Sequence, residues 1–211
     1  MHLHSVIISF NRLDLLQRCY ESYKDTVSVP HTLVIVDNAS SNETRKWLSG
    51  TVSPHDQVIF LETNRFPGFA CNRGWEVMPP KTTHLHRSDN DFAFLPGWCE
   101  RTLATFRKNI GQVGLRTKQE EMYSTSNVGG NNVILRELWD KGLRYDERPW
   151  GNDYPAGWTE DSLLSPAVVE MGYTWSRVNR PCIVSLSYED PDDAYYQRSW
   201  ALRGIKPPER S

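Results

Sequence analysis

The chain has 211 residues, of which 38% are hydrophobic, 24% charged and 11% aromatic, and its formal net charge is −2. This length and composition suit one globular domain and exclude intrinsic disorder. The small net charge excludes a general attraction to nucleic acid or to an anionic membrane, although it is compatible with a local basic patch.

Strand-like and helix-like segments alternate from the start of the chain. Residues 6–9 (VIIS) are a short apolar, β-branched run that predicts a strand, and the apolar spacing that follows predicts a helix capped by Asn11. Residues 33–36 (LVIV) form an uninterrupted apolar run, which indicates a strand covered on both faces. Residues 58–61 predict a third strand.

The alternation continues with a glycine-containing loop at 67–69, a helix near Ala70 and a weak strand at 84–88. This order predicts an α/β fold, a three-layer sandwich with a mostly parallel central sheet. We expect a single domain over residues 1–190. Proline and charged residues accumulate beyond it, so residues 191–211 are predicted to form a peripheral C-terminal arm.

The amino terminus and the cysteines indicate where the protein works. The first residues lack a basic segment, a long apolar stretch and a cleavage site, so we expect no signal peptide. No apolar run approaches the roughly 18 residues of a membrane span. The four cysteines are widely scattered, which favours reduced thiols in a cytoplasmic protein.

Polar residues stand directly after four of the predicted strands. They are Asn11, Asp37, Asn64 and the triplet at 89–91 (DND). Ligands of open α/β sheets bind outside the carboxyl ends of the strands. The sequence therefore predicts a ligand site where these four segments converge.

Six stretches together resemble the family-2 glycosyltransferases of the GT-A fold. They are VIISFNR (6–12), LVIVDNASSNET (33–44), NRFPGFACNRGWE (64–76), SDNDFAFLPGWCE (88–100), GGNNVILRELWDKG (129–142) and TEDSLLSPAVVEMGY (159–173). They occur in the family's order, and it is this order that carries the resemblance, since each stretch alone is weak. The resemblance implies transfer of a sugar from a nucleotide-diphosphate donor, usually UDP-linked, to an acceptor hydroxyl, with inversion and a divalent metal.

The resemblance also implies a donor-binding set. Asp37 matches the carboxylate that hydrogen-bonds the nucleotide base, usually uracil, and the alternative is a turn aspartate that caps the next helix. Gly68 allows close backbone approach, and the helix N-terminus beside it favours phosphate. A plain strand-to-helix turn is the alternative for this loop. The implied donor-binding residues are Ser9, Phe10, Asn11, Asp37, Asn64, Gly68, Asn72, Asp89 and Asn90.

The triplet Asp89-Asn90-Asp91 matches the D-x-D motif of the family. A divalent ion that bridges both phosphates neutralises the charge of the leaving group, and carboxylate oxygens suit Mg²⁺ or Mn²⁺. By resemblance Asp91 is the main metal ligand, whereas Asp89 faces the ribose or a metal-bound water. We expect no packing role for Asp91. The alternative is a solvated acidic turn.

The pair Glu160-Asp161 matches the acidic pair that opens the acceptor-side helix. Inverting transfer needs a base that takes the acceptor's proton while its oxygen attacks the sugar. By resemblance Asp161 is this base, and Glu160 orients it or contacts the donor. The alternative is two carboxylates that only stabilise a first helical turn.

The chain departs from the family's pattern after this pair. Leu163 and Ala167 stand where relatives often carry an aspartate and an arginine, and Pro166 is expected to interrupt the helix. No histidine follows His86 to complete a metal shell, so water or phosphate would take that place.

The acceptor side is predicted from the glycine-asparagine stretch at 129–132 and the aromatic residues after it. Asn131, Asn132 and Trp158 are the candidate acceptor contacts, because rings stack on sugars, although many such rings fill core instead. The acceptor stays open between a saccharide, a lipid-linked molecule and nucleic acid.

Other functions stay open as well. Aromatic and cationic residues alternate from Tyr195 to Arg210, which keeps open a phage-type DNA glycosyltransferase acting on a hydroxymethylated base. A non-catalytic sugar-nucleotide-binding module is disfavoured by the intact acidic residues. A nucleotidyltransferase is disfavoured because no glycine-rich loop follows the first strand. A zinc site is a further alternative, and it would use the paired histidines His2, His4, His84 and His86.

Overall fold

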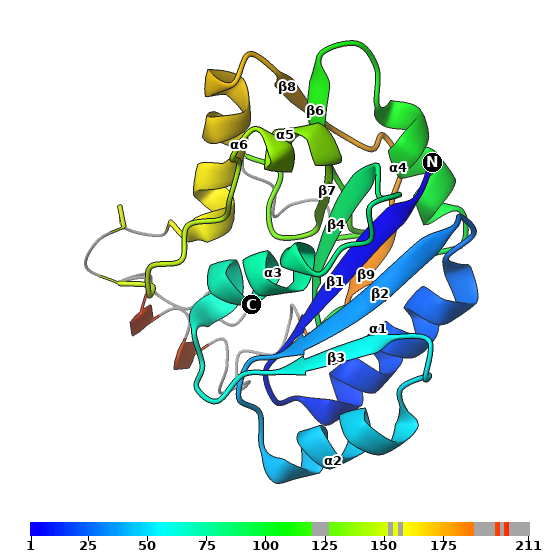
Figure 1. Cartoon of the computed structure of the whole chain (residues 1–211), viewed down its shortest axis with the longest axis vertical. Helices are drawn as coiled ribbons and strands as arrows, with labels where there is room; N and C mark the ends of the chain where they lie inside the picture. Colours follow the sequence, from blue (N-terminus) through cyan, green and yellow to red (C-terminus); the bar gives the residue numbers. More distant parts are fainter. Residues whose placement is uncertain (120–126, 152–153, 156–157, 188–196, 199–200, 203–211) are drawn as a thin grey trace.

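The computed structural model describes residues 1–119, 127–151, 154–155, 158–187, 197–198 and 201–202. A seven-stranded sheet runs through its middle, with helices on both faces (Figure 1). In spatial order the strands are β3 (Gln57–Phe60), β2 (His31–Asp37), β1 (Leu3–Ser9), β4 (His84–Asp89), β7 (Asn132–Leu135), β6 (Ile110–Gly114) and β8 (Thr174–Arg177). Only β7 runs antiparallel to its neighbours in this sheet, so the predicted mostly parallel sheet is confirmed.

Each face of the sheet carries its own apolar core, because successive residues of a strand point to opposite faces. The first core joins β1 and β2 to the helices α1 (Leu13–Thr26), α2 (Asn42–Thr51) and α4 (Trp98–Thr105). The second joins the other side of the same strands to α3 (Phe66–Glu76), α5 (Arg136–Asp140) and α6 (Glu160–Glu170). Figure 1 shows these two helix groups on opposite sides of the sheet, which confirms the three-layer sandwich.

Two short strands form a second, smaller sheet next to the acidic triplet. β5 (Phe92–Phe94) follows β4 directly and pairs antiparallel with β9 (Ile183–Ser185). This small sheet brings residues 183–187 beside the triplet, although they are about ninety residues further along the chain. No helix of the described part is long and apolar enough to cross a membrane.

Two local predictions from the sequence are wrong. Asn11 does not cap α1, because Arg12 precedes the helix and both residues have a φ of 56°. Pro166 does not interrupt α6, which continues through it to Glu170. A proline inside a helix removes one backbone hydrogen bond, and here the packing of the helix on the second core outweighs that loss.

The register of β1 against β4 argues against the zinc alternative. His4 stands opposite Leu85, whereas Leu3 and Ser5 stand opposite His84 and His86, so the two histidine pairs face opposite sides of the sheet. His4 binds the Gly74 carbonyl and the Thr32 hydroxyl on its side. These histidines are largely buried side chains on two sides of the sheet and do not form one cluster.

Candidate active site

A cavity of about 680 Å³, part of it open to solvent, lies at the carboxyl edge of the sheet. Ser9 of β1 stands opposite Asp37 of β2, and Ile8 stands opposite Asp89 of β4, so three neighbouring strands end together there. The residues that line the cavity are Ile8, Phe10, Asn38, Asn64, Phe66, Pro67, Asp89, Asn90, Trp150, Arg198 and Leu202. Four predicted donor-binding residues are therefore brought together: Phe10, Asn64, Asp89 and Asn90.

Sequence reasoning did not assign several residues of this cavity. Asn38 directly follows Asp37, so the strand-end rule could have found it, whereas Phe66 is the first residue of α3 and is not selected by that rule. Trp150 belongs to a segment far along the chain that carries no motif, and Arg198 and Leu202 belong to the arm, whose pattern suggested nucleic acid instead of a sugar nucleotide. Two of the arm's described residues, Arg198 and Leu202, line the cavity, and the peripheral position of the arm as a whole stays a prediction.

Asn11 ties three loops of this edge together. Its backbone N–H donates to the Ser40 hydroxyl over 2.8 Å, and its side-chain oxygen accepts a hydrogen bond from the Ser41 N–H over 2.7 Å. The Asn90 amide donates to the Asn11 carbonyl over 3.0 Å. The positive φ of Asn11 serves this arrangement, because asparagine tolerates the left-handed region better than most residues. Asn11 thus holds Asn90, which lines the cavity, through its backbone carbonyl.

Asp37 is fully buried at the end of β2, and its two carboxylate oxygens differ. One oxygen, Oδ2, lies 3.1 Å from the Arg45 Nε and accepts a hydrogen bond from the Ser40 N–H over 3.3 Å. The other, Oδ1, is buried and has no hydrogen-bond partner among the described residues. The turn contact of the alternative is therefore present, but Ser41 and not Asp37 stands at the N-cap of α2, and Oδ1 keeps one acceptor position. A buried acceptor without a partner costs free energy unless a ligand supplies a donor.

Asp89 belongs to a charge cluster that joins β4 to α6, in which Arg87 and Glu160 are each 2% exposed and Asp89 is 35% exposed. One Arg87 nitrogen, Nη2, donates to Glu160 over 2.7 Å and to Asp89 over 3.3 Å. The second oxygen of Glu160 accepts a hydrogen bond from the Trp150 Nε1 over 2.6 Å. Desolvation raises the pKa of Asp89 to about 6, against the opposing effect of the Arg87 charge. Asp89 reaches the cavity, whereas both oxygens of Glu160 are used inside the protein.

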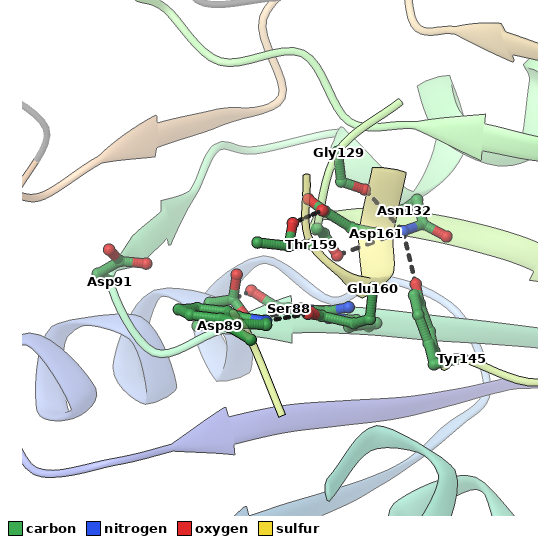
Figure 2. A network of polar contacts seen from close by, with 12 residues as sticks. Ser88, Asp89, Asp91, Gly129, Asn132, Tyr145, Thr159, Glu160 and Asp161 are labelled. Carbon is green, nitrogen blue, oxygen red and sulfur yellow. Dashed lines mark hydrogen bonds and ion pairs between the residues drawn. The ribbon is translucent and has the colours of Figure 1, made fainter. Parts of the chain in front are cut away.

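Asp91 lies apart from this cluster, as Figure 2 shows. Its Oδ2 is 3.2 Å from the Arg12 Nη1 and accepts a hydrogen bond from the Ser187 hydroxyl over 3.0 Å. Its backbone carbonyl accepts a hydrogen bond from the Leu186 N–H. The expectation that Asp91 has no packing role is therefore wrong, because it connects the start of α1 to residues 186–187. Its assignment as the main metal ligand stays a prediction.

The metal site implied by the family fits this edge through Asp89. Among the described residues, no group of three or more histidine, cysteine, aspartate or glutamate side chains is placed to hold a metal ion. Asp89 offers a hard oxygen donor inside the cavity, which suits Mg²⁺ or Mn²⁺. The remaining ligands would then be diphosphate and water oxygens, as these cations commonly allow.

Asp161 lies in the first turn of α6, beside Glu160 but in a different environment (Figure 2). Its Oδ1 accepts hydrogen bonds from the Thr159 and Ser162 hydroxyls, which orient the carboxylate. No described residue donates to its Oδ2, and the side chain is partly exposed. Of the two carboxylates, Asp161 therefore has an oxygen available to accept a proton.

Gly68 and Asn72 hold α3 against the segment before α6. A Cβ on Gly68 would lie 2.0 Å from the Asp146 carbonyl oxygen, so only glycine allows this approach. The Asn72 side chain exchanges hydrogen bonds with the Tyr145 backbone in both directions and also donates to Glu147. These contacts leave both residues supporting the site from inside the protein. Ser9 is likewise buried, and its carbonyl accepts a hydrogen bond from the Asn38 N–H.

The predicted acceptor residues divide between core and surface. The Asn132 amide is buried and donates to the Tyr145 hydroxyl and to the Gly129 carbonyl, so it supports the second core. The Asn131 side-chain oxygen is buried without a hydrogen-bond partner among the described residues. Trp158 is partly exposed two residues before α6. The acceptor roles of all three stay predictions.

Comparison with known proteins agrees with this geometry. Residues 5–156 match the model of the family described as glycosyl transferase family 2. A mannosyltransferase from Pyrobaculum calidifontis, PcManGT, solved in complex with GDP-Man and Mn²⁺, superimposes with a TM-score of 0.71 at 15% identity, over 98% of this chain and 65% of its own. S. aureus TarS 1-349, solved in complex with UDP-GlcNAc, gives a TM-score of 0.68 at 15% identity, over 100% of this chain and 68% of its own. No curated protein sequence matches the chain significantly.

Proposed function

The chain belongs to glycosyl transferase family 2, and from this premise we propose that it moves a sugar from a UDP-linked donor to an acceptor hydroxyl, with inversion and with the help of Mn²⁺ or Mg²⁺. It spans 65% of the mannosyltransferase to which it is similar, so the substrates of the complete protein belong to this proposal. The observation that carries the proposal is the cavity at the strand ends, which is lined by the carboxylate of Asp89 and by the aromatic rings of Phe66 and Trp150.

The Oδ1 of Asp37, buried and unpartnered among the described residues, supports a donor whose base is uracil. Uracil offers a single ring N–H on the edge that a carboxylate would meet, whereas guanine offers an N–H and an amino group side by side. Oδ2 of Asp37 is already bound by Arg45 and Ser40, so the carboxylate has one acceptor position to give. One neighbour was solved with GDP-Man and another with UDP-GlcNAc, and the single acceptor position left on Asp37 of this chain favours the uracil-containing donor.

Two residues supply charge where the diphosphate would lie. Asp89 would hold the divalent ion, which acts as a Lewis acid on the leaving diphosphate when it is bound. Arg198 is the one cationic side chain among the described residues that line the cavity, and it would contact phosphate oxygens directly. Phe66 and Trp150, whose rings lie 5.7 Å apart, would enclose the apolar parts of the donor.

Asp161 is the proposed general base. Its Oδ1 is fixed by Thr159 and Ser162, and its Oδ2 would take the proton of the acceptor hydroxyl as that oxygen attacks the anomeric carbon. The bond from the anomeric carbon to the diphosphate breaks in the same step, so the configuration inverts. The acceptor class stays open between saccharide, lipid-linked and nucleic-acid hydroxyls. The arm's three aromatic residues, Tyr195, Tyr196 and Trp200, all lie outside the described residues.

The test begins with ligand-induced stabilisation. A ligand present at about 100 times its dissociation constant stabilises the native state by roughly 2.7 kcal/mol, or about 6 °C in Tm for a chain of this length. We expect UDP with Mn²⁺ to give such a shift and GDP with Mn²⁺ to give less. Nucleotide release from a panel of sugar nucleotides then identifies the donor. If no nucleotide diphosphate with metal moves the Tm, the proposal is wrong.

A further inference from the structure

Arg87 is a fully enclosed charge in the middle of the molecule. Its side chain is 2% exposed, and its register places it on the sheet between Val6 of β1 and Asn132 of β7. Strand alternation points Arg87 and Asp89 to the same side, toward α3 and α6. A cation at this position lies within the second core, on the same side of the sheet as Val6 and Leu85.

Arg87 contacts three elements at once. Its Nη2 donates to Glu160 at the start of α6 and to Asp89 at the end of β4. Its guanidinium lies 4.6 Å from the centre of the Tyr145 ring, and the Tyr145 hydroxyl is bound by the Asn132 amide. One planar group therefore fixes the distance between a cavity carboxylate and the helix that carries Asp161.

Stability does not explain this arrangement. Replacing a buried ion pair by apolar residues of similar volume is often neutral or stabilising, because desolvation offsets the attraction between the charges. Two further nitrogens of Arg87, Nε and Nη1, are buried without a hydrogen-bond partner among the described residues, which adds to the cost. Replacing Arg87 and Glu160 together by apolar side chains would therefore cost little stability, whereas replacing Arg87 alone would leave the buried Glu160 without its cation.

We infer that Arg87 is a positioning residue for the transfer reaction. It holds Asp89, on the donor side, and Glu160, on the acceptor side, in a fixed relation. Glu160 in turn accepts a hydrogen bond from Trp150, which lines the cavity, and it precedes Asp161 in the same helical turn. The position of Glu160 therefore affects the positions of both residues. The inference rests on the proposed function, since it assigns the two carboxylates to the two substrates. A misplacement of about 1 Å between reacting groups can cost on the order of 100-fold in rate.

The experiment compares Arg87→Lys with Val168→Ala. Lysine keeps the charge but lacks the planar fork, so it cannot hold two carboxylates in the same geometry. Val168 is a fully buried residue of α6 that belongs to the apolar core, so its truncation loosens the same helix without touching the cluster. Tm, donor KM and kcat are measured for both variants and the wild type, well below the lowest Tm.

We expect Arg87→Lys to lower kcat by about 10- to 100-fold while the donor KM changes less than about threefold. Val168→Ala should lower the Tm and leave kcat within about twofold, because its effect is on stability alone. A purely structural role for Arg87 predicts instead that Arg87→Lys lowers the Tm but keeps kcat within about twofold of the wild type, as Val168→Ala does. This result would overturn the inference.

A second variant keeps the test decisive if lysine is poorly tolerated. Arg87→Met with Glu160→Gln removes both buried charges together, so we expect a Tm above that of Arg87→Met alone and a kcat no higher than that of Glu160→Gln alone. A double variant with wild-type kcat contradicts the positioning role. Absence of turnover in the wild type with every donor would overturn the proposed function and the inference together, whereas normal turnover in the variants overturns only the inference.

Discussion

Replacing the carboxylate by an amide should have different effects at the two neighbouring positions Asp161 and Glu160 at the start of α6. Asp161→Asn removes the charge of a partly exposed side chain, and a first-turn carboxylate contributes about 0.3–1 kcal/mol to a helix. Glu160→Gln removes the charge that Arg87 faces in a pair where both side chains are 2% exposed, and breaking such a buried pair costs about 3–5 kcal/mol.

These energies convert into distinct changes in Tm and turnover. A chain of this length has an unfolding entropy of roughly 0.44 kcal/mol/K, so Asp161→Asn should lower the Tm by about 2 °C or less and Glu160→Gln by about 7–11 °C. An amide cannot accept the acceptor's proton, so Asp161→Asn should reduce kcat by about 10²–10⁴-fold with donor affinity nearly unchanged.

Calorimetry of UDP binding, thermal unfolding and single-turnover transfer together separate the two roles. Loss of donor binding in Asp161→Asn, with unchanged turnover per bound donor, would make Asp161 a donor ligand and refute its role as base. An unchanged Tm in Glu160→Gln would refute the view that its pair with Arg87 is a buried and fully formed contact.

Three further predictions concern the core, the close packing of α3 and the cavity. Burial lowers the pKa of His86 from 6.5 to about 3, so the folded state resists protonation of this ring. The free energy of unfolding should therefore be highest above pH 6.5 and should fall by up to about 5 kcal/mol as the pH drops toward 3. His86→Phe should flatten the dependence of Tm on pH, and an unchanged slope would contradict this. Gly68→Ala should lower the Tm strongly because its Cβ meets the Asp146 carbonyl, whereas Gly50→Ala, with nothing within 4 Å, should not; equal Tm values would disprove the close packing. Arg198→Ala should weaken UDP binding about tenfold and uridine binding hardly at all, and an equal loss for both ligands would place Arg198 away from the phosphates.

The fold could be predicted from the sequence because its strands carry simple signals. The run at 33–36 is apolar throughout and proved to be a strand buried on both faces, with Asp37 at its end. The strand β4 was the weakest prediction, since His84, His86 and Arg87 are poor signals for a central strand. Tertiary contacts decide it: Arg87 donates to Glu160 of α6, and the His86 Nδ1 lies 3.1 Å from the Ser5 hydroxyl of β1, and both of these partners are distant in sequence.

The motifs located the site but could not assign the work of each side chain. Asp89 and Asp91 are equivalent in a D-x-D pattern, yet one faces the cavity and the other is bound by Arg12 and Ser187. Glu160 and Asp161 are equivalent in the same sense until Arg87 is placed. Such differences depend on partners from distant segments, which no local pattern contains.

The charges around the cavity give a physical reason for a divalent ion to accompany the donor. Asp37 with Arg45 and Asp91 with Arg12 are paired, but Asp89 and Glu160 share the single guanidinium of Arg87, and Asp161 adds a further negative charge near Asp89. A diphosphate therefore enters a region that is already negative, and Arg198 alone offsets only part of the repulsion. A divalent cation bound between Asp89 and the phosphates would neutralise both sides at once. The affinity for UDP should consequently depend on metal far more than the affinity for uridine does.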